Sequence, residues 1–173
     1  MTRIAYAAGL FAGFLVMSSP AFTADAQWVI TPDGLGPLKI GMTLAQASKA
    51  LGARLTIDAH DSDAVSCSEL DVPDKGGLGM MFENRRLTRI AVFKPSHLKT
   101  TLGIGIGSTE AEVKAKYKPL DDKPQAYDEL PAKDLTWWAT KDKRGIRFQT
   151  DTTKHVKAIF AGNSAITYVE GCE

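Results

Sequence analysis

The side chains best suited to chemistry in this sequence are three histidines, two cysteines and a few adjacent carboxylates. His60, His97 and His155 are far apart, and none has a partner four residues away that would place two metal ligands on one helix face. The acidic segment 58–63 offers oxygen ligands to a cation, but it lacks the glycine that an EF-hand loop needs at its sixth position. We therefore expect surface histidines and no metal site.

Neither a cofactor site nor a catalytic centre is predicted. The string Gly103–Gly107 has no lysine-serine sequel and no preceding βαβ strand, so we expect a strand that leads into a helix instead of a phosphate loop. No Gly-x-Ser-x-Gly elbow is present, and the pairs Asp121-Asp122 and Asp128-Glu129 lie in proline-containing loop sequence. We expect that the protein is not an enzyme; a small hydrolase whose loop carboxylates meet on folding is the alternative.

Two adjacent tryptophans are the best candidates for recognition of a partner. On a strand, Trp137 and Trp138 point to opposite faces, so one should lie nearer solvent than the other. An exposed tryptophan beside Arg147 and Lys141 would suit a contact with another protein. The alternative is that one tryptophan fills the core and the other packs under the loop 120–134.

The two cysteines predict a disulfide, because an exported chain folds where thiols oxidise and neither Cys67 nor Cys172 sits in a CxxC motif. Two separate buried thiols are the alternative. Export itself is predicted by residues 1–26, in which Arg3 precedes the apolar stretch Ile4–Met17 and cleavage after Ala26 is favoured. We expect a periplasmic or secreted protein; a membrane anchor is the weaker alternative, because a span needs ~20 apolar residues.

The rest of the sequence predicts two copies of one structural unit, 27–98 and 99–173, within one compact domain. With a shift of 66 residues, Ile40–Leu51 falls on Ile106–Tyr117. The same shift places 79–82 on 145–148. The net charge of +1 gives no reason to expect a nucleic-acid partner.

Each copy is expected to begin with a capped helix of about ten residues. Thr43 and Thr109 are N-cap candidates, and Gln46 and Glu112 follow three residues later, as in a capping box. Three antiparallel strands should follow each helix, with core-facing alternate side chains. These core-facing residues are Met80 and Phe82 in the first copy and Ile146 and Phe148 in the second. Further strands are expected at sheet edges, at 28–30 and 165–169.

The motif Gly41-Met42-Thr43, followed by a short amphipathic helix and a β-meander, resembles the repeat unit of the SmpA/OmlA outer-membrane assembly lipoproteins. Two such units in tandem resemble the layout of the β-lactamase-inhibitor-protein fold. The resemblance implies an α+β fold whose helices pack on one face of an antiparallel sheet and which binds other proteins. No cysteine follows the signal segment, so we expect no lipid anchor.

These observations together predict an exported, non-catalytic module that binds another protein of the bacterial envelope, as an inhibitor or in assembly. Besides the hydrolase, the second alternative to this module is a structural envelope protein that associates through its sheet edges.

Overall fold

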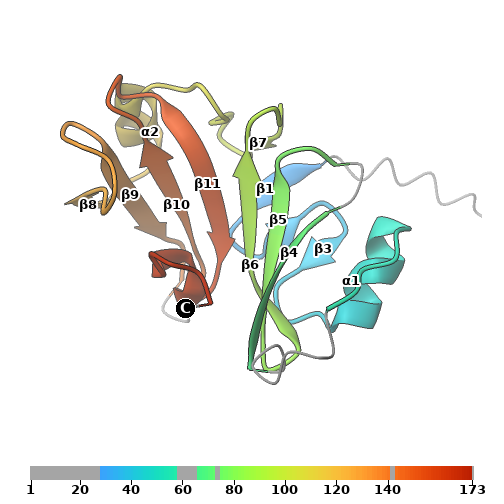
Figure 1. Cartoon of the computed structure of the whole chain (residues 1–173). Coiled ribbons are helices and arrows are strands. Elements are labelled where there is room, and N and C mark those ends of the chain that lie inside the picture. The colour runs from blue at the N-terminus through green and yellow to red at the C-terminus, as the bar shows by residue number, and fades with distance from the viewer. Residues whose placement is uncertain (1–27, 58–65, 73–74, 141–142, 173) are drawn as a thin grey trace, which may run out of the picture.

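The computed structural model describes residues 28–57, 66–72, 75–140 and 143–172, and these form two sheets and two short α-helices (Figure 1). The larger sheet has seven strands in the order β4-β5-β6-β11-β10-β9-β8, and every neighbouring pair is antiparallel. The strands are β4 (Cys67–Asp71), β5 (Leu78–Glu83), β6 (Arg86–Phe93), β8 (Asp121–Pro124), β9 (Lys133–Trp138), β10 (Gly145–Thr150) and β11 (Val156–Gly162). The α+β class predicted from the sequence is confirmed.

A second sheet has four short strands in the order β3-β2-β1-β7. They are β1 (Val29–Thr31), β2 (Gly34–Leu35), β3 (Leu38–Lys39) and β7 (Lys99–Thr100). β1 runs parallel to β7 and antiparallel to β2, so the predicted strand near residue 28 lies inside this sheet and the expected edge position is wrong. Gly34 permits the tight β2–β3 hairpin, because a Cβ there would lie 1.9 Å from the carbonyl oxygen of Leu38.

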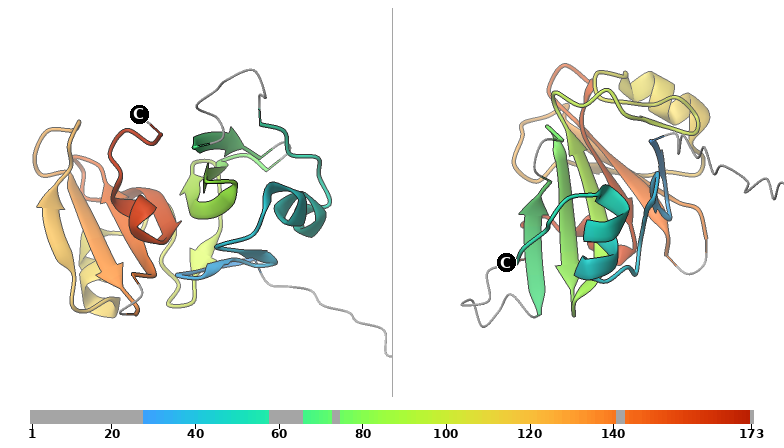
Figure 2. Two further views of the ribbon diagram at one scale, coloured as in Figure 1. Left: turned by 90° about the horizontal axis from the view of Figure 1, so that it is seen from below. Right: turned by 90° about the vertical axis from the view of Figure 1, so that its right-hand side faces the viewer.

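The main core lies on one face of the seven-stranded sheet. Side chains alternate between the two faces of a strand, and the predicted core-facing residues Met80, Phe82, Ile146 and Phe148 are all buried there. Ile30 of β1 is fully buried in the same core. Figure 2 shows the four-stranded sheet on the side of the large sheet opposite the C-terminal segment.

Both predicted helices are present and begin at the predicted residues. In α1 (Leu44–Leu51), the Thr43 hydroxyl accepts from the Gln46 amide at 3.2 Å, and the Gln46 side chain accepts from the Thr43 amide at 2.9 Å. In α2 (Glu110–Lys116), Thr109 and Glu112 form the same capping box, at 3.2 and 2.7 Å. Ala47 of α1 and Val113 of α2 are fully buried in the main core. The helices have eight and seven residues, and are therefore shorter than expected.

Loss of either cap should destabilise the protein measurably. Because the hydroxyl satisfies a helix amide that has no other partner, Thr43→Ala and Thr109→Ala should each lower the free energy of unfolding by about 1 kcal/mol. Urea unfolding of the purified variants measures the change. Thr101→Ala is the matched control, because Thr101 is exposed in a turn outside both helices. An equal loss in Thr101→Ala would contradict the capping explanation.

Three other segments differ from the sequence-based expectations. Residues 165–169 do not form a strand: η2 (Ser164–Thr167) is a 3-10 helix, because the Asn163 side chain accepts from the Ala165 amide at 2.9 Å and caps it. Gly103–Gly107 does not form a strand: the Gly103 amide donates back to Thr100 at 2.8 Å, which closes a turn, and Gly105 makes an isolated β-bridge with Lys99. The loop 120–134 contains the additional edge strand β8.

Candidate functional site

The face of the large sheet that points away from the main core is the candidate functional site, and we call it the open face. Along β6, Ile90 and Val92 enter the main core, whereas Arg89, Ala91 and Phe93 lie on the open face. The open face has a small apolar cluster of its own, made of Ala91, Ala158, Phe160 and Ile166. Polar groups surround this cluster, so the face differs in chemistry from the main core.

Two buried arginines flank the central aromatic ring of the open face. Phe160 lies on β11, between β6, which carries Arg89, and β10, which carries Arg147. The guanidinium carbons lie 5.3 and 4.3 Å from the Phe160 ring centroid. Both side chains are almost completely buried, with 6% and 5% of their surface exposed. Buried charges of this kind need hydrogen-bond partners to offset the loss of hydration.

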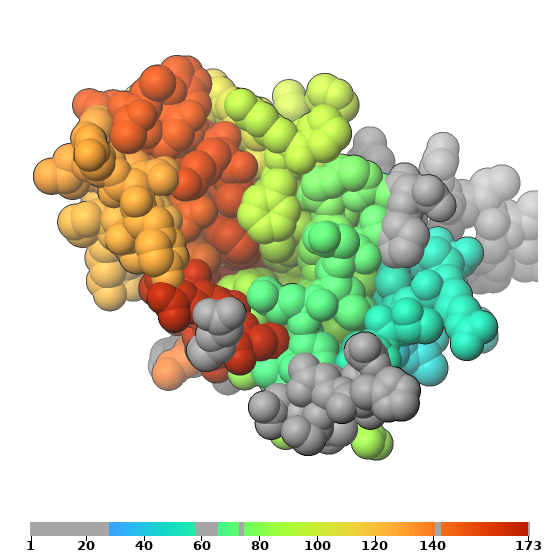
Figure 3. Space-filling view, viewed as in Figure 1, coloured from blue at the N-terminus to red at the C-terminus, as the bar shows by residue number. Residues whose placement is uncertain are grey.

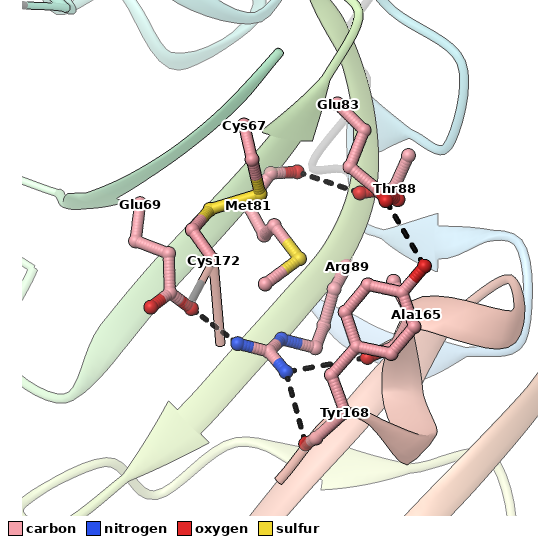
Figure 4. Close-up of a disulfide and its surroundings, with 9 residues drawn as sticks. All are labelled: Cys67, Glu69, Met81, Glu83, Thr88, Arg89, Ala165, Tyr168 and Cys172. Atoms are coloured by element: carbon pink, nitrogen blue, oxygen red, sulfur yellow. Dashed lines mark hydrogen bonds and ion pairs between the residues drawn. A yellow bond between two sulfur atoms is a disulfide. The ribbon is translucent and has the colours of Figure 1, made fainter. Parts of the chain in front are cut away.

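Several of these hydrogen-bond partners are backbone carbonyl oxygens of residues 163–172. This segment crosses the open face, and we call it the C-terminal strap (Figure 3). Arg89 donates to the carbonyl oxygens of Ala165 and Tyr168 at 3.2 and 3.5 Å, and it also binds the Glu69 carboxylate (Figure 4). Arg147 donates to the same Tyr168 oxygen at 3.2 Å. The cations therefore hold the strap at the carboxyl end of η2, where peptide dipoles favour positive charge.

The predicted disulfide joins the end of the strap to β4. Cys67 and Cys172 are bonded, with their Cα atoms 5.5 Å apart. The Tyr168 hydroxyl donates to Glu83 of β5 at 3.0 Å, and this hydrogen bond and the carboxylate charge raise the pKa of Tyr168. The strap is thus attached to β4 by the disulfide, to β5 by the Tyr168 hydroxyl and to β6 by the hydrogen bonds from Arg89 to its backbone.

Burial lowers the pKa of Arg147, and the neighbouring charge of Arg89 acts in the same direction, while Asp134 opposes them. An Arg147 nitrogen lies 3.6 Å from the Asp134 carboxylate. An arginine nevertheless stays protonated inside proteins. The pair of arginines is therefore a permanent positive centre, balanced locally by Glu69 and Asp134.

Two hollows that each contain one of the buried arginines lie beside the strap. One, of about 290 Å³, lies over β4, β5 and β6, and its lining includes Glu69, Asp71, Arg89 and Phe93. The other, of about 230 Å³, lies over β8, β9 and β10, and its lining includes Asp121, Asp134, Arg147 and Val169. Each hollow therefore combines carboxylates with one buried arginine.

The residues proposed for partner binding from the sequence are only partly brought together. Trp137 and Trp138 are both half-buried and point to opposite faces. The Trp137 ring lies 5.1 Å from that of Tyr117 in the main core. Trp138 packs beside the open-face cluster and donates from its indole nitrogen to Asp121 at 3.2 Å. Trp138 and Arg147 share the open face; Lys141 lies outside the described residues.

Asp121 and Asp122, one of the carboxylate pairs suggested as an alternative catalytic centre, have different partners. Asp121 accepts from Trp138, whereas Asp122 is bound by Lys114 at 2.6 Å and by Lys133 at 3.0 Å. Burial raises the pKa of Asp122, but the two lysines outweigh that effect and hold the pKa below its usual value. A carboxyl group in this state is a poor general acid at neutral pH.

The remaining chemical candidates show ordinary contacts. His97 and His155 are exposed, and the His155 amide donates to Asp151. His60 and the acidic segment 58–63 lie outside the described residues. In the described part of the chain, no three metal-binding side chains form a group, and no helix is long and apolar enough to cross a membrane.

Sequence reasoning missed the exposed apolar side chains of the strap and its neighbour. Tyr168 and Val169 are 38% and 52% exposed, and Tyr127, which is 64% exposed, donates from its hydroxyl to Glu170. The sequence signal available for them was Asn163 as a helix cap together with Cys172 as an anchor. Because the segment 165–169 was interpreted as a strand, the exposure of these side chains was not predicted.

These side chains, the two hollows and the arginine pair belong to one surface. The chain matches no protein-family model, no curated protein and no solved structure at a significant level. What the open face does must therefore be inferred from its own geometry and charge.

Proposed function

We propose that this chain is an exported, non-catalytic protein-binding module of the bacterial envelope and that its open face is the binding surface. The observation that carries the proposal is the C-terminal strap, which presents Tyr168 and Val169 to solvent on a backbone held by two arginines and a disulfide. Fixing exposed aromatic and aliphatic side chains before binding reduces the entropy lost on association. Tyr127 extends this surface beyond the strap.

The tandem arrangement of the two halves is part of the proposal, and equivalent hydrogen bonds support it. The Gly41 amide donates to Leu87 at 2.7 Å, and the Leu87 amide donates to Met42 at 2.8 Å. In the second half, Gly107 donates to Val156 and Val156 donates to Ser108, both at 2.8 Å; Val156 is the counterpart of Leu87 because the hairpin turn before it is three residues longer. Such matched contacts are what a duplicated helix-plus-meander unit, with both helices on one face of the sheet, would retain.

Export to the periplasm or the cell exterior is supported by the disulfide, because such bonds persist in oxidising compartments. The signal segment 1–26 and its cleavage site lie outside the described residues. The resemblance to SmpA/OmlA and β-lactamase-inhibitor proteins favours protein binding over catalysis, and it remains a prediction from the sequence.

Affinity capture from envelope extract tests the proposal with matched variants. Val169→Asp places a charge on the strap, whereas Leu102→Asp places one on an equally accessible side chain in the turn after β7; these two residues are 52% and 45% exposed. We expect the wild type and Leu102→Asp to retain the same partner and Val169→Asp to lose at least about tenfold in affinity, as for a central interface residue.

The affinities are then measured with the purified partner, after thermal unfolding has shown that both variants are folded. Equal binding by Val169→Asp and the wild type would contradict an interface on the open face. Failure to capture any partner, together with turnover by the pure protein in hydrolase screens, would contradict the proposed function as a whole.

A further inference from the structure

The accessible charges of the open face are mostly carboxylates, although its two arginines suggest a basic surface. Arg89 and Arg147 are buried and already bound, so they offer little charge to an incoming partner. Among the described residues that line the hollows of this face, Lys123 is the only other cation. The carboxylates come in pairs: Glu69 with Asp71 and Asp121 with Asp134 line the two hollows described above. Glu83 and Glu170 line a third hollow of about 460 Å³ beside the disulfide. A partner with a basic contact surface would complement this face.

The hollow over β4, β5 and β6 has the shape to receive one long side chain. Its floor is low because Gly79 and Ala91 face each other across β5 and β6. A Cβ added at Gly79 would make ordinary contacts, 3.6 Å from Ala91 and 3.7 Å from Phe93, and would raise that floor. Phe93 forms one wall; it is 38% exposed, and an edge-on contact with Phe160 at 5.8 Å holds its ring. An alkyl chain would therefore have apolar neighbours along its length.

The charge at the rim of this hollow is unbalanced. Glu69 is bound to Arg89, so these two charges offset each other. Asp71 lies two residues further along β4 on the same face, and its carboxylate makes no hydrogen bond or ion pair within the described part of the chain. The rim therefore carries a net negative charge beside an accessible aromatic ring. Guanidinium groups bind carboxylates through two parallel hydrogen bonds and also stack on aromatic rings.

We propose that this hollow receives the side chain of an arginine from a basic surface of the partner protein. The guanidinium pairs with Asp71, and the alkyl stem lies along Phe93 over the floor made by Gly79 and Ala91. This inference rests on the proposed function, since it specifies the partner's chemistry at the same face.

The direct test is an NMR titration of the isotopically labelled protein with Nα-acetylarginine N-methylamide. We expect saturable shifts of the Asp71, Gly79 and Ala91 amide signals. The matched probe is the citrulline analogue, which has nearly the same shape without the charge, and it should bind about tenfold more weakly. Equal affinity for the two probes, or shifts confined to other surfaces, would overturn the inference, as would the absence of saturable shifts up to the solubility limit of the arginine probe.

Asp71→Asn should abolish the preference for the charged probe, whereas Asp121→Asn in the other hollow should leave it intact. Unchanged discrimination in Asp71→Asn would refute the assigned role of this carboxylate. The result is separable from the capture experiment. If the captured partner binds Asp71→Asn as tightly as the wild type, the arginine inference fails while the proposed function stands; if no partner exists, the probe titration still reports on the hollow.

Discussion

Replacing both Cys67 and Cys172 with serine should lower the free energy of unfolding by roughly 4 to 5 kcal/mol. The bond links residues 105 positions apart, and closing a loop of that length removes a large amount of conformational entropy from the unfolded chain. The total stability of a domain is typically about 5–15 kcal/mol, so the loss is a large share of it. Of the substitutions considered, this one should have the largest effect.

Urea unfolding of the oxidised wild type and of the double-serine variant measures the difference. Adding a phosphine reductant should lower the stability of the wild type to that of the variant and leave the variant itself unchanged. A difference below about 1 kcal/mol would mean that the unfolded chain gains little freedom when the bond is absent.

The second large effect is expected from Arg147→Met. Methionine keeps the packing against Phe160, but it leaves the Asp134 carboxylate without its cation and the Tyr168 carbonyl oxygen with only the longer hydrogen bond from Arg89, at 3.5 Å. Breaking one side of a buried charge pair costs about 3–5 kcal/mol, and since Asp134 is 15% exposed we expect the lower end of that range.

A double-mutant cycle separates the charge pair from packing. Asp134→Asn in the Arg147→Met background removes the unpaired charge, so the double variant should recover at least about 1 kcal/mol relative to Arg147→Met alone. Denaturation of the four proteins under one set of conditions gives the coupling energy. Strictly additive losses would show that the two side chains act independently and that Arg147 contributes mainly through the strap.

Local signals in the sequence were sufficient for the helices and the central strands. The capping boxes at Thr43 and Thr109 involve residues three positions apart, so their geometry depends little on the rest of the chain. The alternation that buries Phe82 and Phe148 is likewise local. The disulfide was predictable because only two cysteines are present and their compartment favours oxidation.

Features created by contacts between distant segments were missed. β8 (Asp121–Pro124) is exposed at all four positions, so it shows no apolar alternation, and it is a strand only because β9 supplies its hydrogen bonds. The four-stranded sheet is built from pieces of two or three residues, too short to give a periodic signal.

The candidate site was the least predictable part, because burial reverses what residue type suggests. Arg147 looked like a surface cation beside tryptophan, yet it is 5% exposed and holds the protein's own backbone. The Tyr168 segment alternates like a strand, and the capping side chain of Asn163 directs it into a 3-10 turn across the sheet. The surface is consequently more acidic than the sequence indicated.

The parallel pairing of Val29 and Ile30 with Lys99 and Thr100 has a consequence for the order of folding. β1 begins the described chain, but one of its edges has no hydrogen-bonding strand until residue 100 has been synthesised. Ile30 is fully buried in the main core, which also contains residues beyond 98, such as Val113 and Phe148, so that core cannot be completed from residues 28–98 alone. Although the sequence predicts two units that meet between 98 and 99, the first of them should reach its final packing only when the chain has grown past that position.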